Sequence, residues 1–419
     1  MPVVRNGVEA YRSDQLVVER EYTGMVQEGL RRLGIAASEL DSSAPLSLTL
    51  LGLSGADTAA ALLRQDSALV AAAIAAQQAA GRTSATISDL DLILSDLRQW
   101  LRAGNDGWLV TIGKNRILDR VQGSPYIKGG VGEPDPTAPL SLPPVAQQTG
   151  ARVAVLDTQL FAHPDLIGRF LGDSTAAFST EPRATAGHST FVAGLIAQRA
   201  PAAQLIVHTV LDDDGANASS WDVATAMAST SDAGVAVLNL SLGCATIDRV
   251  PPLTLSRAVQ RLIPSVVVVA AAGNNGVPDA DATASGLTPT TPIYPAAIDG
   301  VIAVGAYDPS DGTGEPAAFS PKVPWLDLLA PGVRVRSTFL PGQVLLVRRD
   351  PDGSLVDEGS ADFGQPGYAS WDGTSFAAAN VTGAIAALTV AGQVSAYEAL
   401  DQLRNPAGPG GDILPYGKG

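Results

Sequence analysis

The spacing of apolar and polar residues divides the chain into two parts with different patterns. In the first part, short apolar runs alternate with segments whose apolar residues recur at helical spacing. These patterns predict strands at residues 15–20, 46–53 and 108–112, and helices at residues 23–33, 56–80 and 89–101. We therefore expect an α+β domain over residues 1–128.

Residues 129–149 differ in composition from both parts, because prolines stand at positions 134, 136, 139, 143 and 144. Prolines at this density prevent regular structure and favour an extended, exposed segment. The pattern predicts a linker here, with a domain boundary on either side.

Beyond the linker, predicted strands alternate with predicted helices over residues 150–419. This alternation is typical of an α/β domain, and the β-branched run at residues 266–271 indicates a parallel strand buried on both faces. We expect a doubly wound, mostly parallel sheet. Two apolar runs on either side of Asp350-Pro351-Asp352-Gly353 predict an inserted hairpin at about residues 340–367. The predicted strands are 152–156, 204–210, 235–240, 266–271 and 301–304, and the predicted helices are 189–199, 220–233, 253–262 and 375–391.

Composition narrows the function classes. The 419 residues are 46% apolar, carry a formal net charge of -15 and have a pI near 4.6. An acidic protein is not expected to bind nucleic acid or anionic membranes. One cysteine, Cys244, rules out an internal disulfide, and with three histidines a structural zinc site is not expected.

The first residues contain no apolar stretch of the kind found in signal peptides, and no apolar run approaches the length of a membrane span. The simplest expectation is a cytoplasmic protein. A secreted protein whose leader had been removed would have the same sequence.

Four polar residues are predicted at the carboxyl edge of the sheet, where open α/β sheets bind ligands. Asp157 ends a strand, Asn274 follows another, and His188 and Ser375 stand where helices begin. Each alone has a simple structural explanation as a cap or a turn residue. Their coincidence at one edge favours catalysis, and Asp, His, Ser is one of the chain orders in which catalytic triads occur.

Five segments, in this order, resemble the motifs of subtilisin-like serine proteases (subtilases). The matching segments are 152–158 with 163–166, 187–194, 239–243, 271–274 and 373–378. Residues 294–296, 301–306 and 329–333 also resemble this family, so the similarity extends from about Gly150 to about Gly392.

The resemblance implies a serine endopeptidase that hydrolyses polypeptides by acyl transfer. Ser375 would be the nucleophile, His188 the general base and acid, and Asp157 the residue that orients the imidazole. The Asn274 amide and the Ser375 N–H would form the oxyanion hole. Substrate would pair with a strand at Leu240, Ser241, Leu242 and Gly243, and a primary side-chain pocket would adjoin Ala271, Ala272 and Gly273.

Some positions depart from the family pattern. Ser189 and Phe191 stand where a glycine and a second histidine are usual, and Ala379-Asn380 replaces Pro-His. They leave open an alternative, a catalytically impaired peptide-binding protein with this fold. A lipase-type nucleophile elbow at residues 187–191 lacks its second glycine, and a dinucleotide-binding loop is not found.

The first domain resembles, by its position and element order, the propeptide of this family. This implies a zymogen in which the domain acts as an intramolecular chaperone and inhibitor, with autocleavage near residues 129–150. The alternative is a permanent accessory domain. We expect no cofactor and no metal; calcium is common in the family, and Asp212-Asp213-Asp214-Gly215 is the best acidic run, although such runs are usually solvated turns.

Overall fold

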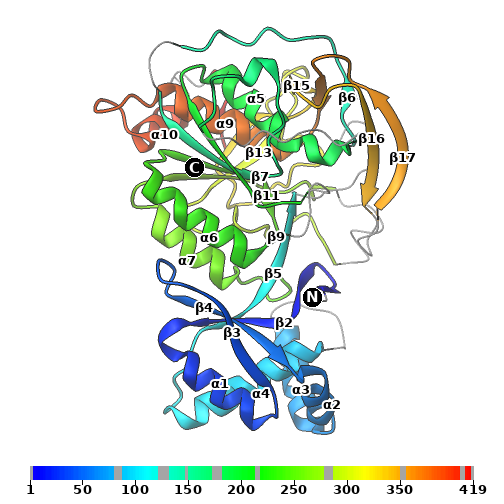
Figure 1. Ribbon diagram of the computed structural model, residues 1–419, viewed down its shortest axis with the longest axis vertical. Helices are drawn as coiled ribbons and strands as arrows, with labels where there is room; N and C mark the ends of the chain where they lie inside the picture. The colour runs from blue at the N-terminus through cyan, green and yellow to red at the C-terminus, as the bar shows by residue number, and fades with distance from the viewer. Residues whose placement is uncertain are drawn as a thin grey trace.

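A computed structural model of the chain describes residues 3–79, 87–120, 132–146, 150–171, 182–212, 218–277, 286–349, 355–405 and 411–416. The described residues form two modules stacked along the longest axis of the molecule (Figure 1). We call residues 3–120 the N-terminal module and residues 150–416 the C-terminal module.

The N-terminal module is an antiparallel sheet with helices packed on one face. Leu16 and Val18 lie in a core with Leu30 and Leu97 from these helices, whereas Val17 points to the opposite face. The sheet order is β5-β2-β4-β3, with β1 paired to β2. Its elements are β1 (Val3–Asn6), β2 (Glu9–Glu19), η1 (Arg20–Tyr22), α1 (Thr23–Arg32), β3 (Ala36–Ser43), β4 (Leu48–Ser54), α2 (Ala56–Leu63), α3 (Ser67–Ala79), α4 (Asp89–Gly104) and β5 (Ile112–Arg120).

No single helix in the described ranges is long and apolar enough to cross a membrane. Helices α2 and α3 meet that criterion only when counted together, and they are bent by 102°.

The C-terminal module contains a seven-stranded sheet in the order β19-β14-β13-β12-β10-β7-β8. All neighbouring strands are parallel except β19, which pairs antiparallel with β14. The strands are β7 (Arg152–Asp157), β8 (Gln204–Thr209), β10 (Val237–Leu240), β12 (Val267–Ala271), β13 (Ile302–Tyr307), β14 (Leu328–Pro331) and β19 (Leu414–Pro415).

Helices cover both faces of this sheet. Helices α5 (His188–Arg199), α9 (Thr374–Leu388) and α10 (Ala396–Arg404) cover one face, and α6 (Ser220–Thr230) and α7 (Leu253–Leu262) the other. Successive residues of β7 alternate accordingly, because Val153 and Val155 lie in the α5 core whereas Ala154 and Leu156 lie in the α6–α7 core. The predicted doubly wound, mostly parallel α/β fold is confirmed.

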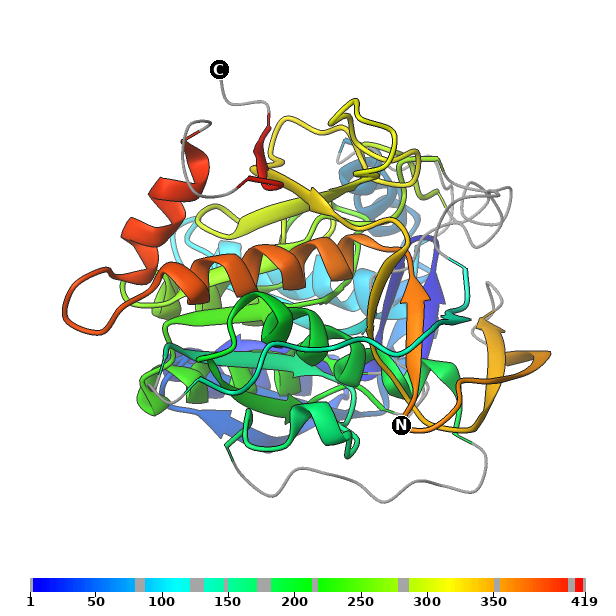
Figure 2. The same cartoon turned by 90° about the horizontal axis from the view of Figure 1, so that it is seen from above.

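A small sheet and a hairpin lie beside the seven-stranded sheet. The small sheet has the order β15-β18-β6, from β15 (Val335–Thr338), β18 (Tyr368–Trp371) and β6 (Asp135–Pro136). Strands β16 (Gln343–Arg349) and β17 (Leu355–Asp362) pair antiparallel and project from the edge of the molecule (Figure 2). The expected hairpin turn at 350–353 lies outside the described residues. Part of the predicted linker forms an edge strand, where the missing N–H of Pro136 is tolerated.

Strand β5 joins the two modules (Figure 1). Its second half pairs with two short strands of the C-terminal module, β9 (Ala218–Ser219) and β11 (Leu242–Gly243). Around it, Leu48 and Leu50 of β4 pack in one apolar core with Trp221 of α6 and Leu255 of α7. The free face of the N-terminal sheet is therefore buried against helices α6 and α7.

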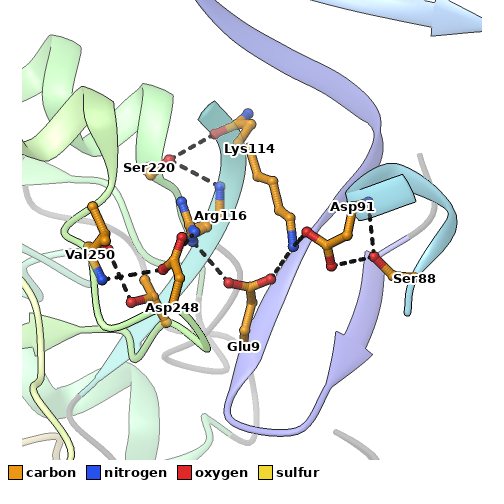
Figure 3. Close-up of polar contacts among 10 residues, drawn as sticks. Glu9, Ser88, Asp91, Lys114, Arg116, Ser220, Asp248 and Val250 are labelled. Carbon is orange, nitrogen blue, oxygen red and sulfur yellow. Dashed lines mark hydrogen bonds and ion pairs between the residues drawn. The ribbon is translucent and has the colours of Figure 1, made fainter. Parts of the chain in front are cut away.

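Buried charges lie at this junction (Figure 3). The Glu9 carboxylate forms ion pairs with both Lys114 and Arg116, and the three side chains are between 1% and 7% exposed. Lys114 also contacts Asp91 at 2.6 Å, and Arg116 reaches Asp248 of the C-terminal module at 3.5 Å. Burial alone would raise the pKa of Glu9, but the charges of Arg116 and Lys114 outweigh it, so the pKa lies below its ordinary value of 4.5.

Several predicted elements of the N-terminal module were wrong. The single helix predicted at 56–80 is replaced by two, α2 and α3, because the Asp66 carboxylate accepts the amide hydrogens of Ala68 and Leu69 and starts a new helix. The strand predicted at 108–112 lies at 112–120 instead. The charged residues of this strand, Lys114 and Arg116, are buried because they pair with Glu9. Strand β3 was not predicted.

We predict that Glu9→Gln destabilises the N-terminal module by about 3 kcal/mol or more near neutral pH, because it leaves two buried cations without their shared carboxylate. Because the pKa of Glu9 is lower in the folded chain than in the unfolded one, the charged carboxylate stabilises the fold above pH 4.5. This stabilisation is lost as the pH falls through the pKa of the folded state. Denaturant unfolding of a Ser375→Ala chain, with and without Glu9→Gln, measures this. The acid-dependent loss should be larger in the chain that keeps Glu9. Glu39→Gln, at an exposed position, is the control, and equal losses in all three would contradict the prediction.

Candidate active site

Asp157 and His188 are in direct contact. Asp157 is the last residue of β7 and His188 the first of α5, and their side chains are almost fully buried. His188 Nδ1 lies 2.8 Å from Asp157 Oδ1 and 2.9 Å from Oδ2. A carboxylate only accepts hydrogen bonds, so Nδ1 carries the hydrogen and the lone pair of the neutral ring is on Nε2.

Thr158 fixes this pair in place. Its hydroxyl donates to the Ala186 carbonyl and accepts the Ser189 amide hydrogen, both at 3.1 Å. These bonds connect the end of β7 to the beginning of α5. The rings of Trp371 and Phe376 pack beside the imidazole, at centroid distances of 5.8 and 5.5 Å. Sequence reasoning quoted Thr158 within a motif but gave it no role.

Ser375 is the second residue of α9 and directly precedes Phe376, whose ring packs beside the His188 imidazole. Its hydroxyl donates to the Ser241 carbonyl at 3.3 Å, and the Ser241 hydroxyl donates to the Ser375 carbonyl at 2.9 Å. The structure thus brings Ser375 to the predicted substrate strand. Among the hydrogen bonds of the described residues, none joins Ser375 to His188.

Asn274 is held against the start of the same helix. Its Oδ1 accepts the amide hydrogen of Thr374 at 3.0 Å and the Thr374 hydroxyl at 2.9 Å. With Oδ1 directed to Thr374, the donor end of the amide is directed away from it. Asn274 is 1% exposed, as expected for a side chain with a fixed orientation.

The predicted substrate strand is already paired. Leu242 and Gly243 of β11 lie opposite Arg120 and Asp119 of β5 in an antiparallel register. Leu240 and Ser241, just before β11, are fully buried. The N-terminal module therefore occupies the backbone edge that was assigned to substrate.

The three small residues before Asn274 have different surroundings. Ala271 and Ala272 are buried in different cores, on opposite faces of the sheet. Gly273 has φ +118°, and a side chain there would meet Ile293. Ile293 was missed by sequence reasoning, although it precedes the family-like segment 294–296.

The departures from the family pattern lie in packed positions. The ring of Phe191 packs against that of Phe376 in a tilted arrangement, with the ring centroids 4.5 Å apart. Asn380 donates to the Pro331 carbonyl at 2.9 Å and accepts from Arg199 at 2.6 Å. Ser189 is fully buried, and its hydroxyl lacks a partner among the described residues. None of the three displaces Asp157 from His188.

Among the described residues, no group of three or more His, Cys, Asp or Glu side chains is arranged to hold a metal ion. Most of the acidic run at 212–215 lies outside the described residues, so the calcium hypothesis is untested.

Comparisons with known proteins fit this geometry. A family model described as the subtilase family matches residues 148–407. A thermophilic serine proteinase of Bacillus sp. (strain AK1) is 31% identical over 285 residues, which are 64% of this chain and 60% of the relative. Subtilisin BL of Lederbergia lenta is 34% identical over 282 residues, or 65% of this chain and 88% of the relative.

Among solved structures, fervidolysin from Fervidobacterium pennivorans, a keratinolytic enzyme related to subtilisin, has a TM-score of 0.56 at 20% identity. The match covers 92% of this chain and 55% of fervidolysin, and at this identity it shows the fold alone. The class defined by these findings is that of the subtilisin-like serine endopeptidases. The chain belongs to the subtilase family.

We predict that Thr158→Val lowers the free energy of unfolding by about 2 kcal/mol, because it leaves the buried Ala186 carbonyl and Ser189 amide without their partner. Thr254→Val is a matched control, since Thr254 is equally buried but its hydroxyl has no partner among the described residues. Chemical denaturation should show a loss for the first variant and little or no loss for the second. Similar values for the two would contradict the role of Thr158.

Proposed function

We propose that the chain is a zymogen of a serine endopeptidase that hydrolyses peptide bonds through an acyl-enzyme. Ser375 attacks the substrate carbonyl. His188 takes the hydroxyl proton and gives it to the leaving amine, while Asp157 holds the ring and stabilises the imidazolium. The Asn274 amide and the Ser375 backbone N–H stabilise the oxyanion.

The observation that carries this proposal is the contact of His188 Nδ1 with both oxygens of Asp157, at 2.8 and 2.9 Å. It makes Nε2 the base and fixes the ring plane. The Thr374–Asn274 bonds support the proposal independently, because they hold the amide beside the N-terminus of the helix that carries Ser375. A helix N-terminus favours the negative charge that develops there.

In our proposal, the Ser375 hydroxyl changes its hydrogen-bond acceptor from the Ser241 carbonyl to His188 during catalysis. The hydroxyl donates to Ser241 while β5 covers the neighbouring strand. A change of the χ1 rotamer would redirect the hydroxyl to His188 Nε2 once a substrate replaces β5. Catalytic hydrogen bonds are often absent before substrate binds, so the present contact is compatible with this step.

The N-terminal module supports the zymogen part of the proposal. Its strand β5 takes the backbone edge of β11 as an extended peptide substrate would, by strand addition. Polar bonds strengthen the docking: Asn115 Oδ1 accepts the Trp221 amide hydrogen at 3.0 Å and the Ser220 hydroxyl at 3.1 Å. We infer that the module inhibits by occupying the substrate strand.

The register in which β5 pairs with β11 also indicates where the chain would be cleaved. Arg120 lies opposite Leu242, next to Ser241, the hydrogen-bond partner of Ser375. Gly132 is held by the C-terminal module, because its carbonyl accepts the Trp371 indole hydrogen at 2.7 Å. We therefore propose cleavage after Arg120 and before Gly132, which is upstream of most of the range 129–150 expected from sequence.

We predict that Asn274→Ala lowers kcat about 10² to 10³-fold with a small change in KM, because the amide acts mainly on the charge of the transition state. This magnitude is the one found for the oxyanion-hole asparagine of subtilisin. Steady-state hydrolysis of a peptide measures it, with every variant first processed by tagged wild-type protein that is then removed, and with Ser375→Ala as the inactive control. Full activity in Asn274→Ala would contradict the assigned oxyanion hole, and activity in Ser375→Ala would contradict the nucleophile.

We predict that incubation of the purified full chain yields a new N-terminus between residues 121 and 132. Intact-mass measurement and N-terminal sequencing locate it, and Ser375→Ala should remain whole. A fully active preparation in which the chain stays intact would contradict the zymogen, and a terminus within 133–150 would contradict the register argument.

A further inference from the structure

Ile293 fills the space between two glycines beside the reacting centre. A β-carbon built on Gly243 would lie 2.7 Å from Ile293 Cγ2, and one built on Gly273 would lie 2.9 Å from Ile293 Cγ1. The two branches of one side chain therefore reach both glycines. Ile293 is 6% exposed, so it belongs to the packed interior and not to the surface.

The backbone around Ile293 is fixed. The next residue, Tyr294, exchanges two backbone hydrogen bonds with Cys244, at 2.9 and 2.8 Å. Cys244 in turn follows Gly243 directly, so Ile293 is tied to the end of β11. Isoleucine is branched at Cβ and has few χ1 rotamers, which makes it a rigid wall.

This space is where a substrate side chain would enter. A peptide paired with β11 passes Leu242 and Gly243, and its reacting carbonyl must reach Ser375 and Asn274. Gly273 immediately precedes Asn274. The side chain of the residue that carries the reacting carbonyl would therefore lie between β11 and Gly273, on the side of Ile293. Asn275 limits the same space, because its Oδ1 also adjoins Gly273.

We propose that Ile293 closes the primary side-chain pocket, so that the enzyme cuts after glycine, alanine or serine and discriminates against leucine and phenylalanine. This inference rests on the proposed endopeptidase function and adds its specificity. A larger side chain would have to displace a packed isoleucine or its backbone, which is unfavourable in a well-packed interior.

The test uses chromogenic peptides that differ only in the residue before the cleaved bond, succinyl-Ala-Ala-Pro-X-p-nitroanilide with X as Ala, Leu or Phe. For the processed wild type we expect kcat/KM for Ala to exceed that for Phe at least about tenfold. Ile293→Gly should move the Phe/Ala ratio at least about tenfold towards Phe, and the smaller change Ile293→Val should move it part of the way. Ile298→Ala, in the same segment and in a different contact, should leave the ratio unchanged.

The outcomes separate the two proposals. A wild type that cuts after Phe as readily as after Ala, or variants of Ile293 that keep the wild-type ratio, would overturn the specificity inference and leave the endopeptidase intact. If the processed protein cuts none of these peptides nor an unfolded protein substrate, the proposed function fails and the specificity falls with it. Should Ile293→Gly fail to fold, the ratio for Ile293→Val decides.

Discussion

The contact between the Asp157 carboxylate and the His188 imidazole depends on one junction, that between the end of β7 and the start of α5. Strand β7 lies between β10 and β8 in a parallel sheet whose two faces are buried, which fixes the position of its last residue. Thr158 then joins the strand to the helix by two hydrogen bonds. The proposed proton transfers, from Ser375 and to the leaving amine, both require the imidazole orientation that this junction fixes.

The same edge of the sheet also explains how the two modules meet. Strand β11 follows β10 and offers a backbone edge with which an extended chain can pair. In this structure β5 covers it, and apolar side chains with buried ion pairs hold the N-terminal module in register. In our proposal, inhibition and substrate binding are therefore alternative uses of one strand.

Sequence was most informative where a local pattern and the tertiary environment agree. Helix α7 was predicted at its observed bounds, and β7 within a residue, because apolar residues follow the periodicity of each element. Strand β5 was misplaced because Lys114 and Arg116 are buried through a partner, Glu9, that is distant in sequence. The bond from Ser375 to Ser241 and the position of Ile293 depend on long-range packing, so no local pattern could indicate them.

Covalent labelling of the processed protein with a fluorophosphonate, followed by peptide mapping, tests the central claim most directly. The reagent reacts with a serine that an adjacent base activates. The account predicts one adduct, on Ser375, and its loss in a His188→Ala chain that tagged wild-type protein has processed before being removed. Absence of an adduct on Ser375 in the wild type, or equal labelling in His188→Ala, would contradict it.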